Sequence, residues 1–212
     1  MIGSALVLRE SPAAAQAAGT GGWQPSRHAQ DDWLDRLAGK HRFVFDTTSP
    51  AGLGNALLYA NNFFLANQSG YGLGNDDAAV VIVVRHNSTS FAYTDAMWAK
   101  YGRPLGDAGG FSDPKTKNPP TINVYNSTTH GTQLPNNGIT LDSLTTRGVH
   151  FAVCQMATRR FAGAVATATG GNTDRVYEEL VANLIANSHM VPAGIVAVNR
   201  AQERGYTFAH GG

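Results

Sequence analysis

The chain has 212 residues, of which 42% are hydrophobic and 15% charged, and its formal net charge is +1 at pH 7. This length is enough for one domain with a sizeable core. The low net charge excludes the broad basic surface that proteins use to bind nucleic acid or anionic membranes. A single cysteine excludes both an intrachain disulfide framework and a cysteine-cluster metal site.

The first 22 residues differ in composition from the rest of the chain. Residues 1–8 are apolar but too short to span a bilayer, and residues 15–17 show the small-x-small pattern of a signal-peptidase site. A basic region before the apolar run is missing. Two predictions remain open: a truncated export signal of a periplasmic protein, with a mature chain from about Ala18, or a disordered tail of a cytoplasmic one. Residues 23–212 are predicted to form a single domain.

The domain begins with a short amphipathic helix at 31–37, which ends at Gly39, and a first strand at 42–46. A helix is expected from about 53 to 65. The loop before it carries Gly52-x-Gly54, but the third glycine of the dinucleotide fingerprint and the Walker lysine are both absent. We therefore expect a tight turn here rather than a nucleotide site, and no cofactor.

Residues 78–86 form the second predicted strand. Their continuous apolar run is typical of a strand that is covered on both faces of a parallel sheet. Arg85 and His86 end this strand, and we predict that they bind an anion or a thiolate. The alternative is that they are a solvated end of a hydrophobic strand. A helix that is capped by Ser88 or Thr89 and runs to about 101 is expected next.

Residues 102–138 are rich in Pro, Gly, Asn, Asp and Thr, and they are predicted to be a long polar insertion. Within it, 121–125 has the composition of a short strand. We expect the insertion to act as a lid over the cysteine edge of the sheet or as an arm between subunits. His130 lies in this segment and is expected to be exposed.

The only cysteine, Cys154, follows a third predicted strand at 149–153 and precedes an Ala-rich helix that ends near Gly170. At such a junction the unpaired N–H groups of the helix start favour a thiolate, which is the nucleophilic form. Gln155 is a further candidate binding residue beside the thiol. Arg159 and Arg160 could also help to favour the thiolate, although they lie more than one turn along the helix. The alternative is a small, buried, unreactive cysteine. His150 is expected to be a core or interface histidine.

The last elements complete the sheet: a helix at 174–187 capped by Asn172 or Thr173, a fourth strand at 189–193, a helix at 194–204 and an edge strand at 206–209. The alternation predicts an α/β fold with a doubly wound, mostly parallel sheet of about five strands and helices on both faces. The sequence has seven histidines but no HExxH or other ligand spacing, so no metal site is predicted.

Two segments resemble the DsrE-like family, whose members include bacterial sulfur-relay subunits. Residues 148–160, Gly-Val-His-Phe-Ala-Val-Cys-Gln-Met-Ala-Thr-Arg-Arg, are similar to the region around the sulfur-carrying cysteine of that family, and residues 190–208 are similar to its closing helix and strand. With the order of elements, the resemblance covers about 41–212. It implies a single-domain sulfur-relay protein that carries a persulfide on Cys154 and transfers sulfur to a partner thiol, on a protein or a small molecule.

The resemblance also implies a homo- or hetero-oligomer with the cysteine near an interface. We predict a homo-oligomer, and we predict that the chain has no membrane span. The long insertion and the pair Gln155-Met156 depart from the family pattern. The alternative function is a non-catalytic exported module that binds a small ligand or assembles as a subunit.

Overall fold

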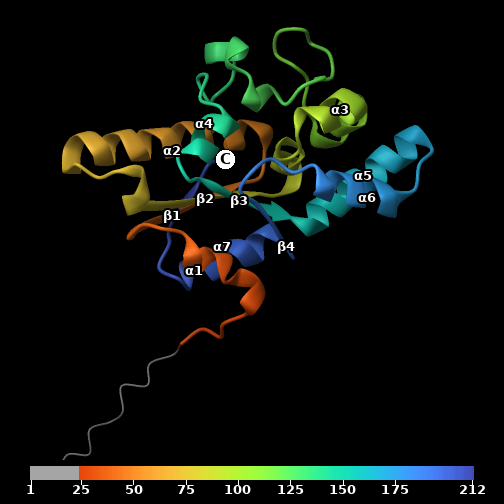
Figure 1. Ribbon diagram of the computed structural model, residues 1–212. Helices are drawn as coiled ribbons and strands as arrows, with labels where there is room; N and C mark the ends of the chain where they lie inside the picture. The colour runs from red at the N-terminus through yellow and green to blue at the C-terminus, as the bar shows by residue number, and fades with distance from the viewer. Residues whose placement is uncertain (1–23) are drawn as a thin grey trace, which may run out of the picture.

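The computed structural model describes residues 24–212 and is built around a five-stranded sheet (Figure 1). The strand order is β4-β3-β2-β1-β5, and every neighbouring pair is parallel. This confirms the predicted α/β class and the five strands. The export-signal prediction concerns residues 1–22, which lie outside the described part of the chain. The strands are β1 (His41–Thr47), β2 (Ala78–Val84), β3 (His150–Cys154), β4 (Ser188–Val191) and β5 (Thr207–His210).

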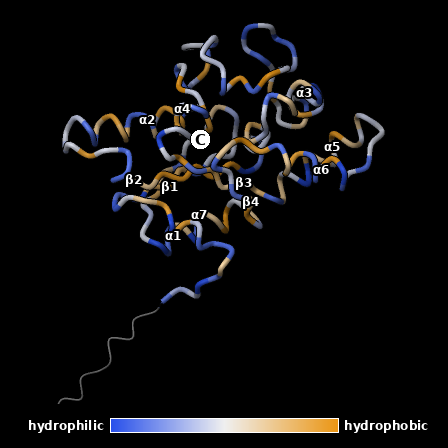
Figure 2. Tube along the Cα trace, viewed as in Figure 1, coloured by the Kyte–Doolittle hydropathy of each residue, from blue (hydrophilic) through white to orange (hydrophobic). Residues whose placement is uncertain are grey.

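Helices cover both faces of the sheet, as doubly wound α/β folds require. Alternate strand residues point to opposite faces, so Phe45 and Ile82 pack in one core while Val44 and Val81 pack in the other. The first core is covered by α2 (Pro50–Tyr71), α3 (Asp95–Gly109), α4 (Leu141–Thr146), α5 (Gln155–Thr169) and α6 (Thr173–Ala182). The second is covered by α1 (Trp33–Arg36) and α7 (Gly194–Gln202), which lie below the sheet in Figure 1. Hydrophobic residues follow the strands between the two layers in Figure 2.

The start of α2 differs from the expected tight turn. Ser49 caps the helix by accepting a hydrogen bond from the Gly52 N–H at 2.9 Å, and Pro50 occupies the first turn, where its missing N–H costs nothing. Gly52 and Gly54 are therefore helical. A Cβ on Gly52 would lie 2.0 Å from the Gly212 carbonyl oxygen, so this glycine permits the chain after β5 to pass directly over the helix.

The segment after β2 also differs from expectation. Ser88 and Thr89 lie within a 3-10 helix, η3 (His86–Ala92), and do not cap α3. The helix α3 continues through Gly102 and Pro104 to Gly109, so the irregular insertion begins later than predicted. The segment 121–125 forms no strand and contributes to a 3-10 turn, η4 (Val124–Asn126).

Residues 110–138 pack on the helices that cover the first core. The buried Asn123 side chain donates to the carbonyl oxygens of Phe91 and Tyr93 at 2.8 and 3.0 Å, and the Tyr125 hydroxyl donates to the Pro50 carbonyl at 2.6 Å. His130 is buried beside Asp113, with 3.2 Å between Nε2 and Oδ1, and is not exposed as predicted. These contacts make the segment an ordered part of the domain.

Gly102 provides a direct test of this packing. A Cβ there would lie 1.9 Å from the Pro120 carbonyl oxygen, so we expect Gly102→Ala to lower the free energy of unfolding by about 1–3 kcal/mol. Urea unfolding measures the change. The matched control is Gly163→Ala in α5, where a Cβ meets no atom within 4 Å and should add about 0.5–1 kcal/mol of stability. Equal effects of the two substitutions would contradict the close approach.

Candidate functional site

A crevice opens at the carboxyl ends of β3 and β4 because the chain leaves these adjacent strands toward opposite faces of the sheet. After β3 it enters α5 on the first face, and after β4 it enters α7 on the second. Ligands of open α/β sheets bind in crevices outside the carboxyl ends of the strands. A pocket of about 260 Å³ lies here, lined by Arg85, His86, Cys154, Met156, Ala157, Arg160, Ala193, Gly194 and Ile195.

Cys154 lies at the base of this pocket, as the last residue of β3 and the N-cap of α5. Its Sγ accepts a hydrogen bond from the Ala157 N–H at 3.5 Å, and its carbonyl accepts one from the Thr158 hydroxyl at 3.0 Å. The residue is 6% exposed. An N-cap position places the sulfur beside the partly positive N–H groups at the start of α5.

Arg85 is held rigidly beside the pocket. Its guanidinium donates two hydrogen bonds of 2.7 Å to the Asp46 carboxylate, and these bonds raise the pKa of Arg85 despite its partial burial; the Cys154 side chain adds a smaller contribution in the same direction. On the other side, a Cβ on Gly194 would lie 2.6 Å from the Arg85 Cβ, so α7 starts directly against the arginine. Asp46 thus fixes a cation near the thiol.

His86 and Arg160 also line the pocket. His86 adopts a left-handed backbone conformation with φ of 52°, and its carbonyl oxygen accepts from the Arg160 guanidinium at 3.4 Å. Arg160 also donates to the Asn87 side chain and to the Ala108 carbonyl, each at 3.0 Å. The second guanidinium of the pocket is therefore also fixed, although Arg160 is more than one turn along α5 from the cysteine.

Gln155 is directed away from this site. Its side-chain amide donates to the Tyr177 hydroxyl on α6 at 3.0 Å, and it does not line the pocket. Arg159 is likewise turned toward α6, where it approaches Asp174 at 3.4 Å. The structure therefore brings Arg85 and His86 to the cysteine but not Gln155. None of residues 110–138 lines the pocket, so the insertion is no lid over Cys154 in this structure.

Sequence reasoning missed Asp46 and Gly194 as site residues, and it named Arg160 only as a possible helper of the thiolate. Asp46 was placed at the end of the first strand, and the rule that led to Arg85 and His86 applies equally to it, because the carboxyl ends of parallel strands share one edge. Arg160 and Gly194 carry no comparable local signal. They reach the pocket through the packing of α5 and α7.

The pocket combines an apolar wall with fixed positive groups. Met156, Ala157, Ala193 and Ile195 supply the apolar surface, and Met156 and Ile195 are 69% and 58% exposed at its rim. The α7 N-terminus faces the pocket opposite that of α5 and adds a second set of partly positive N–H groups. Such a pocket can hold a polarizable anion between an apolar surface and hydrogen-bonded guanidinium groups.

Residues 24–212 contain no cluster of three or more His, Cys, Asp or Glu side chains with the geometry of a metal site. Within the same range, every helix is too short or too polar to cross a membrane.

Comparisons with known proteins place the chain in no family. No family model and no curated protein matches the sequence. Among solved structures, a protein of unknown function from Methanobacterium thermoautotrophicum aligns with a TM-score of 0.40 and 16% identity, over 81% of this chain and 99% of that chain. A similarity this remote says nothing about activity, so function must be argued from the pocket itself.

Proposed function

We propose that this protein carries sulfur as a persulfide on Cys154 and transfers it to the thiol of a partner protein or a small molecule. The observation that supports the proposal most directly is the placement of Sγ. It lies at the N-cap of α5, inside a pocket that is bordered by two fixed guanidinium groups and by the start of a second helix. The resemblance around Cys154 points to the same chemistry.

The transfer needs no external oxidant or reductant. The Cys154 thiolate attacks the outer sulfur of a donor persulfide, R–S–SH; the new Sγ–S bond forms, the donor S–S bond breaks, and the electron pair leaves on the donor thiolate. The thiolate of the acceptor then attacks the same outer sulfur, and the Cys154 thiolate leaves. Since the chain has only one cysteine, the acceptor thiol must come from another molecule.

The environment of Cys154 suits the bound intermediate. The first step leaves the outer sulfur of Cys154 protonated, and the donor thiolate or solvent takes up that proton. The resulting persulfide anion carries its charge on the outer sulfur, one bond beyond Sγ. Arg85 and Arg160 lie on that pocket's wall, and the apolar side chains of Met156 and Ile195 surround its opening. Cations that are already held in place by hydrogen bonds stabilise a developing anion without having to reorganise.

Intact-mass spectrometry tests the proposal. The full chain is incubated with a low-molecular-weight persulfide, and the mass is read before and after addition of a thiol acceptor. We expect one added sulfur atom that the acceptor removes, and no adduct in Cys154→Ala. An unreactive thiol in the folded protein would contradict sulfur transfer and would favour the alternative function, a non-catalytic module that binds a small ligand.

A relocated cysteine separates the contribution of the pocket from that of a helix start. Asn172 is the N-cap of α6, exposed, and its side chain accepts from the Arg175 N–H at 3.0 Å. The double variant Cys154→Ala, Asn172→Cys therefore places a thiol at a helix N-terminus without a pocket. We expect its persulfide to form but to be lost at least about tenfold faster to solvent thiols. Equal persistence of the two persulfides would show that the pocket contributes nothing.

A further inference from the structure

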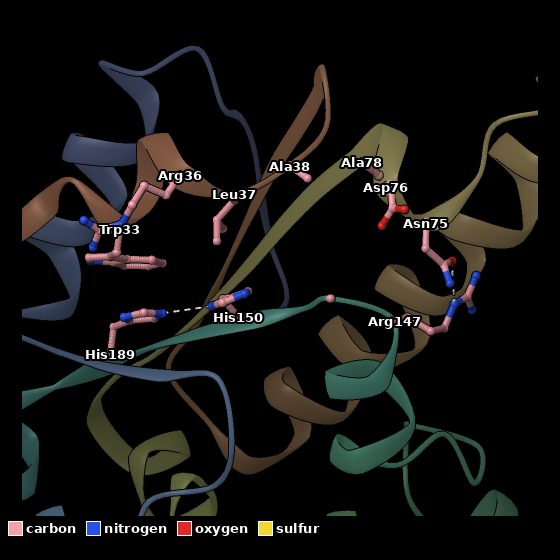
Figure 3. A pocket seen from close by; sticks show the side chains of 11 residues that line it. Trp33, Arg36, Leu37, Ala38, Asn75, Asp76, Ala78, Arg147, His150 and His189 are labelled. Carbon is pink, nitrogen blue, oxygen red and sulfur yellow. Dashed lines mark hydrogen bonds between the residues drawn. The ribbon is translucent and has the colours of Figure 1, made fainter.

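A second pocket lies at the opposite, amino edge of the sheet and has no part in the proposed sulfur chemistry (Figure 3). It measures about 330 Å³ and is bordered by α1, the starts of β2 and β3, and one residue of β4. Its residues are Trp33, Arg36, Leu37, Ala38, Asn75, Asp76, Ala78, Arg147, Gly148, His150 and His189.

Three aromatic rings form a continuous stack at one end of this pocket. The Trp33 indole lies on the His189 imidazole with 3.9 Å between ring centroids and 7° between ring planes. His189 Nε2 is 2.9 Å from His150 Nδ1 on the neighbouring strand, a hydrogen-bond distance. Figure 3 shows the His189 imidazole beneath the indole and the His150 imidazole beside it, joined to His189 by the dashed line. Trp33 belongs to the short helix α1, so the stack joins the segment before β1 to the ends of β3 and β4.

The bond between the imidazoles sets a limit on their protonation. It requires a donor N–H on one ring and a lone pair on the other, and a doubly protonated pair has only donors. One proton added to the pair can therefore leave the bond intact. A second proton must break the bond, because it places positive charges on both adjacent imidazoles. The charged groups around the pair are Arg36 on α1, Arg147 before β3 and Asp76 before β2, so cations outnumber anions.

The pKa values of both histidines are shifted in the direction that favours neutral rings. Burial lowers the pKa of His150, and burial together with the positive charges of His150 and Arg36 lowers the pKa of His189 to about 4. The folded state thus favours neutral rings. The stack is at full strength above the ordinary histidine value of about 6.5 and is lost as the pH falls toward about 4.

We propose that the Trp33–His189–His150 stack is an acid-sensitive latch, which holds α1 on the amino ends of β3 and β4 at neutral pH and releases Trp33 when both imidazoles are protonated. The released group is the Trp33 side chain, and its departure widens the pocket at the amino edge. The rest of α1 stays attached, because the Leu34 carbonyl accepts from Tyr206 at 2.7 Å and Asp35 pairs with Arg204 at 3.0 Å.

Nuclear magnetic resonance of the full chain tests the latch. The ring signals of His150 and His189 and the indole N–H signals of Trp33 and Trp98 are followed from about pH 8 to about pH 4. We expect the two histidines to titrate together below the ordinary histidine range. Over the same interval, the Trp33 indole N–H should lose at least about tenfold of its exchange protection, while the Trp98 signal stays constant in the core.

Two substitutions sharpen the test. His189→Phe keeps a flat ring under Trp33 but removes the titrating group, so the Trp33 transition should disappear. His41→Gln replaces an exposed histidine on β1 and should leave the transition unchanged. A Trp33 signal that does not respond to pH in the unaltered chain, or one that responds equally in His189→Phe, would overturn the latch.

Discussion

Asp46→Ala is expected to lower the free energy of unfolding by about 3–5 kcal/mol, because it leaves the Arg85 guanidinium partly buried without its counter-ion. The side chains of Asp46 and Arg85 are only 5% and 18% exposed, and both hydrogen bonds between them measure 2.7 Å. Asp46 also lies 3.5 Å from His210 on β5, so its loss unpairs groups on both sides of β1. Urea unfolding at neutral pH measures the change.

Two variants serve as controls for this prediction. Asp174→Ala removes the partner of Arg159 at the surface, where the carboxylate is 79% exposed, and should cost less than about 1 kcal/mol. The double variant Asp46→Ala, Arg85→Met removes both charges, and we expect it to recover a large part of the lost stability. If Asp46→Ala were as mild as Asp174→Ala, the pair would not be what fixes Arg85.

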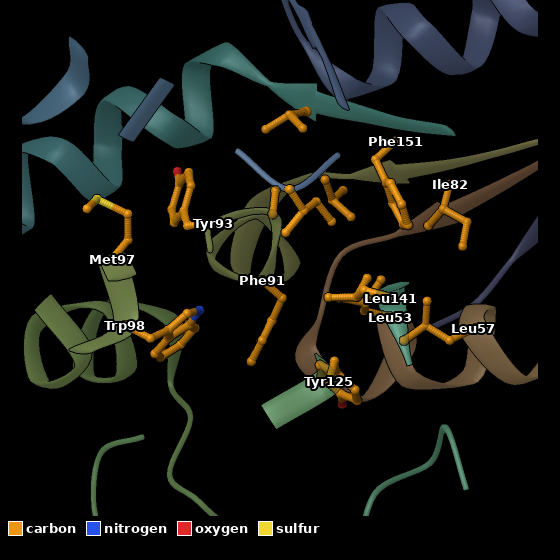
Figure 4. Packing of buried hydrophobic residues seen from close by; sticks show 14 of the residues in the cluster. Leu53, Leu57, Ile82, Phe91, Tyr93, Met97, Trp98, Tyr125, Leu141 and Phe151 are labelled. Carbon is orange, nitrogen blue, oxygen red and sulfur yellow. The ribbon is translucent and has the colours of Figure 1, made fainter. Parts of the chain in front are cut away.

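Phe91→Ala is the second substitution with a large expected effect, a loss of about 3–5 kcal/mol in the free energy of unfolding. Phe91 is fully buried at the centre of an aromatic cluster, with ring centroids 5.1 Å from Trp98, 5.1 Å from Phe111 and 4.8 Å from Tyr125. Figure 4 shows Phe91 with Trp98 and Tyr125. The ring thus holds together η3, α3 and the segment 110–138. Its removal leaves a cavity that these three elements cannot close without moving.

Thermal or urea unfolding compares Phe91→Ala with Phe208→Ala, a phenylalanine on the edge strand β5 that is 44% exposed. The control should cost about 1 kcal/mol or less, since little buried surface is lost. Limited proteolysis adds a local reading. We expect cleavage within 110–138 to accelerate in Phe91→Ala and not in Phe208→Ala. Unchanged cleavage in both variants would show that the segment is held by other contacts.

The central strands β2 and β3 could be predicted from sequence because they are mostly apolar runs with clear ends. Residues 78–84 are buried on both faces, and a continuous run of apolar residues requires such a position. Cys154 could be placed for the same reason: a strand that ends immediately before an Ala-rich helix leaves little choice about where the junction lies. Local pattern and tertiary structure agree at these positions.

The regions that sequence reasoning described wrongly depend on contacts between distant residues. Gly102 and Pro104 suggested the end of a helix, but α3 has a kink at Tyr101, where φ is −124°, and Pro104 lies in the first turn after it, where proline is tolerated. The burial of Asn123 and His130 depends on partners that composition does not reveal. The same holds for Arg160, which reaches the pocket only because α5 packs beside the end of α3.

The short strand β3 has a consequence for how the two pockets behave. It begins at His150 and ends at Cys154, so the two pockets are separated by about 13 Å along one rigid element. Side chains alternate along a strand, which puts both residues on the face covered by α1 and α7. Arg204 and Tyr206, just after α7, form hydrogen bonds with Asp35 and Leu34 of α1. A tilt of α1 and α7 would therefore move the walls of both pockets. A substitution that changes one pocket should also be tested for its effect on the other.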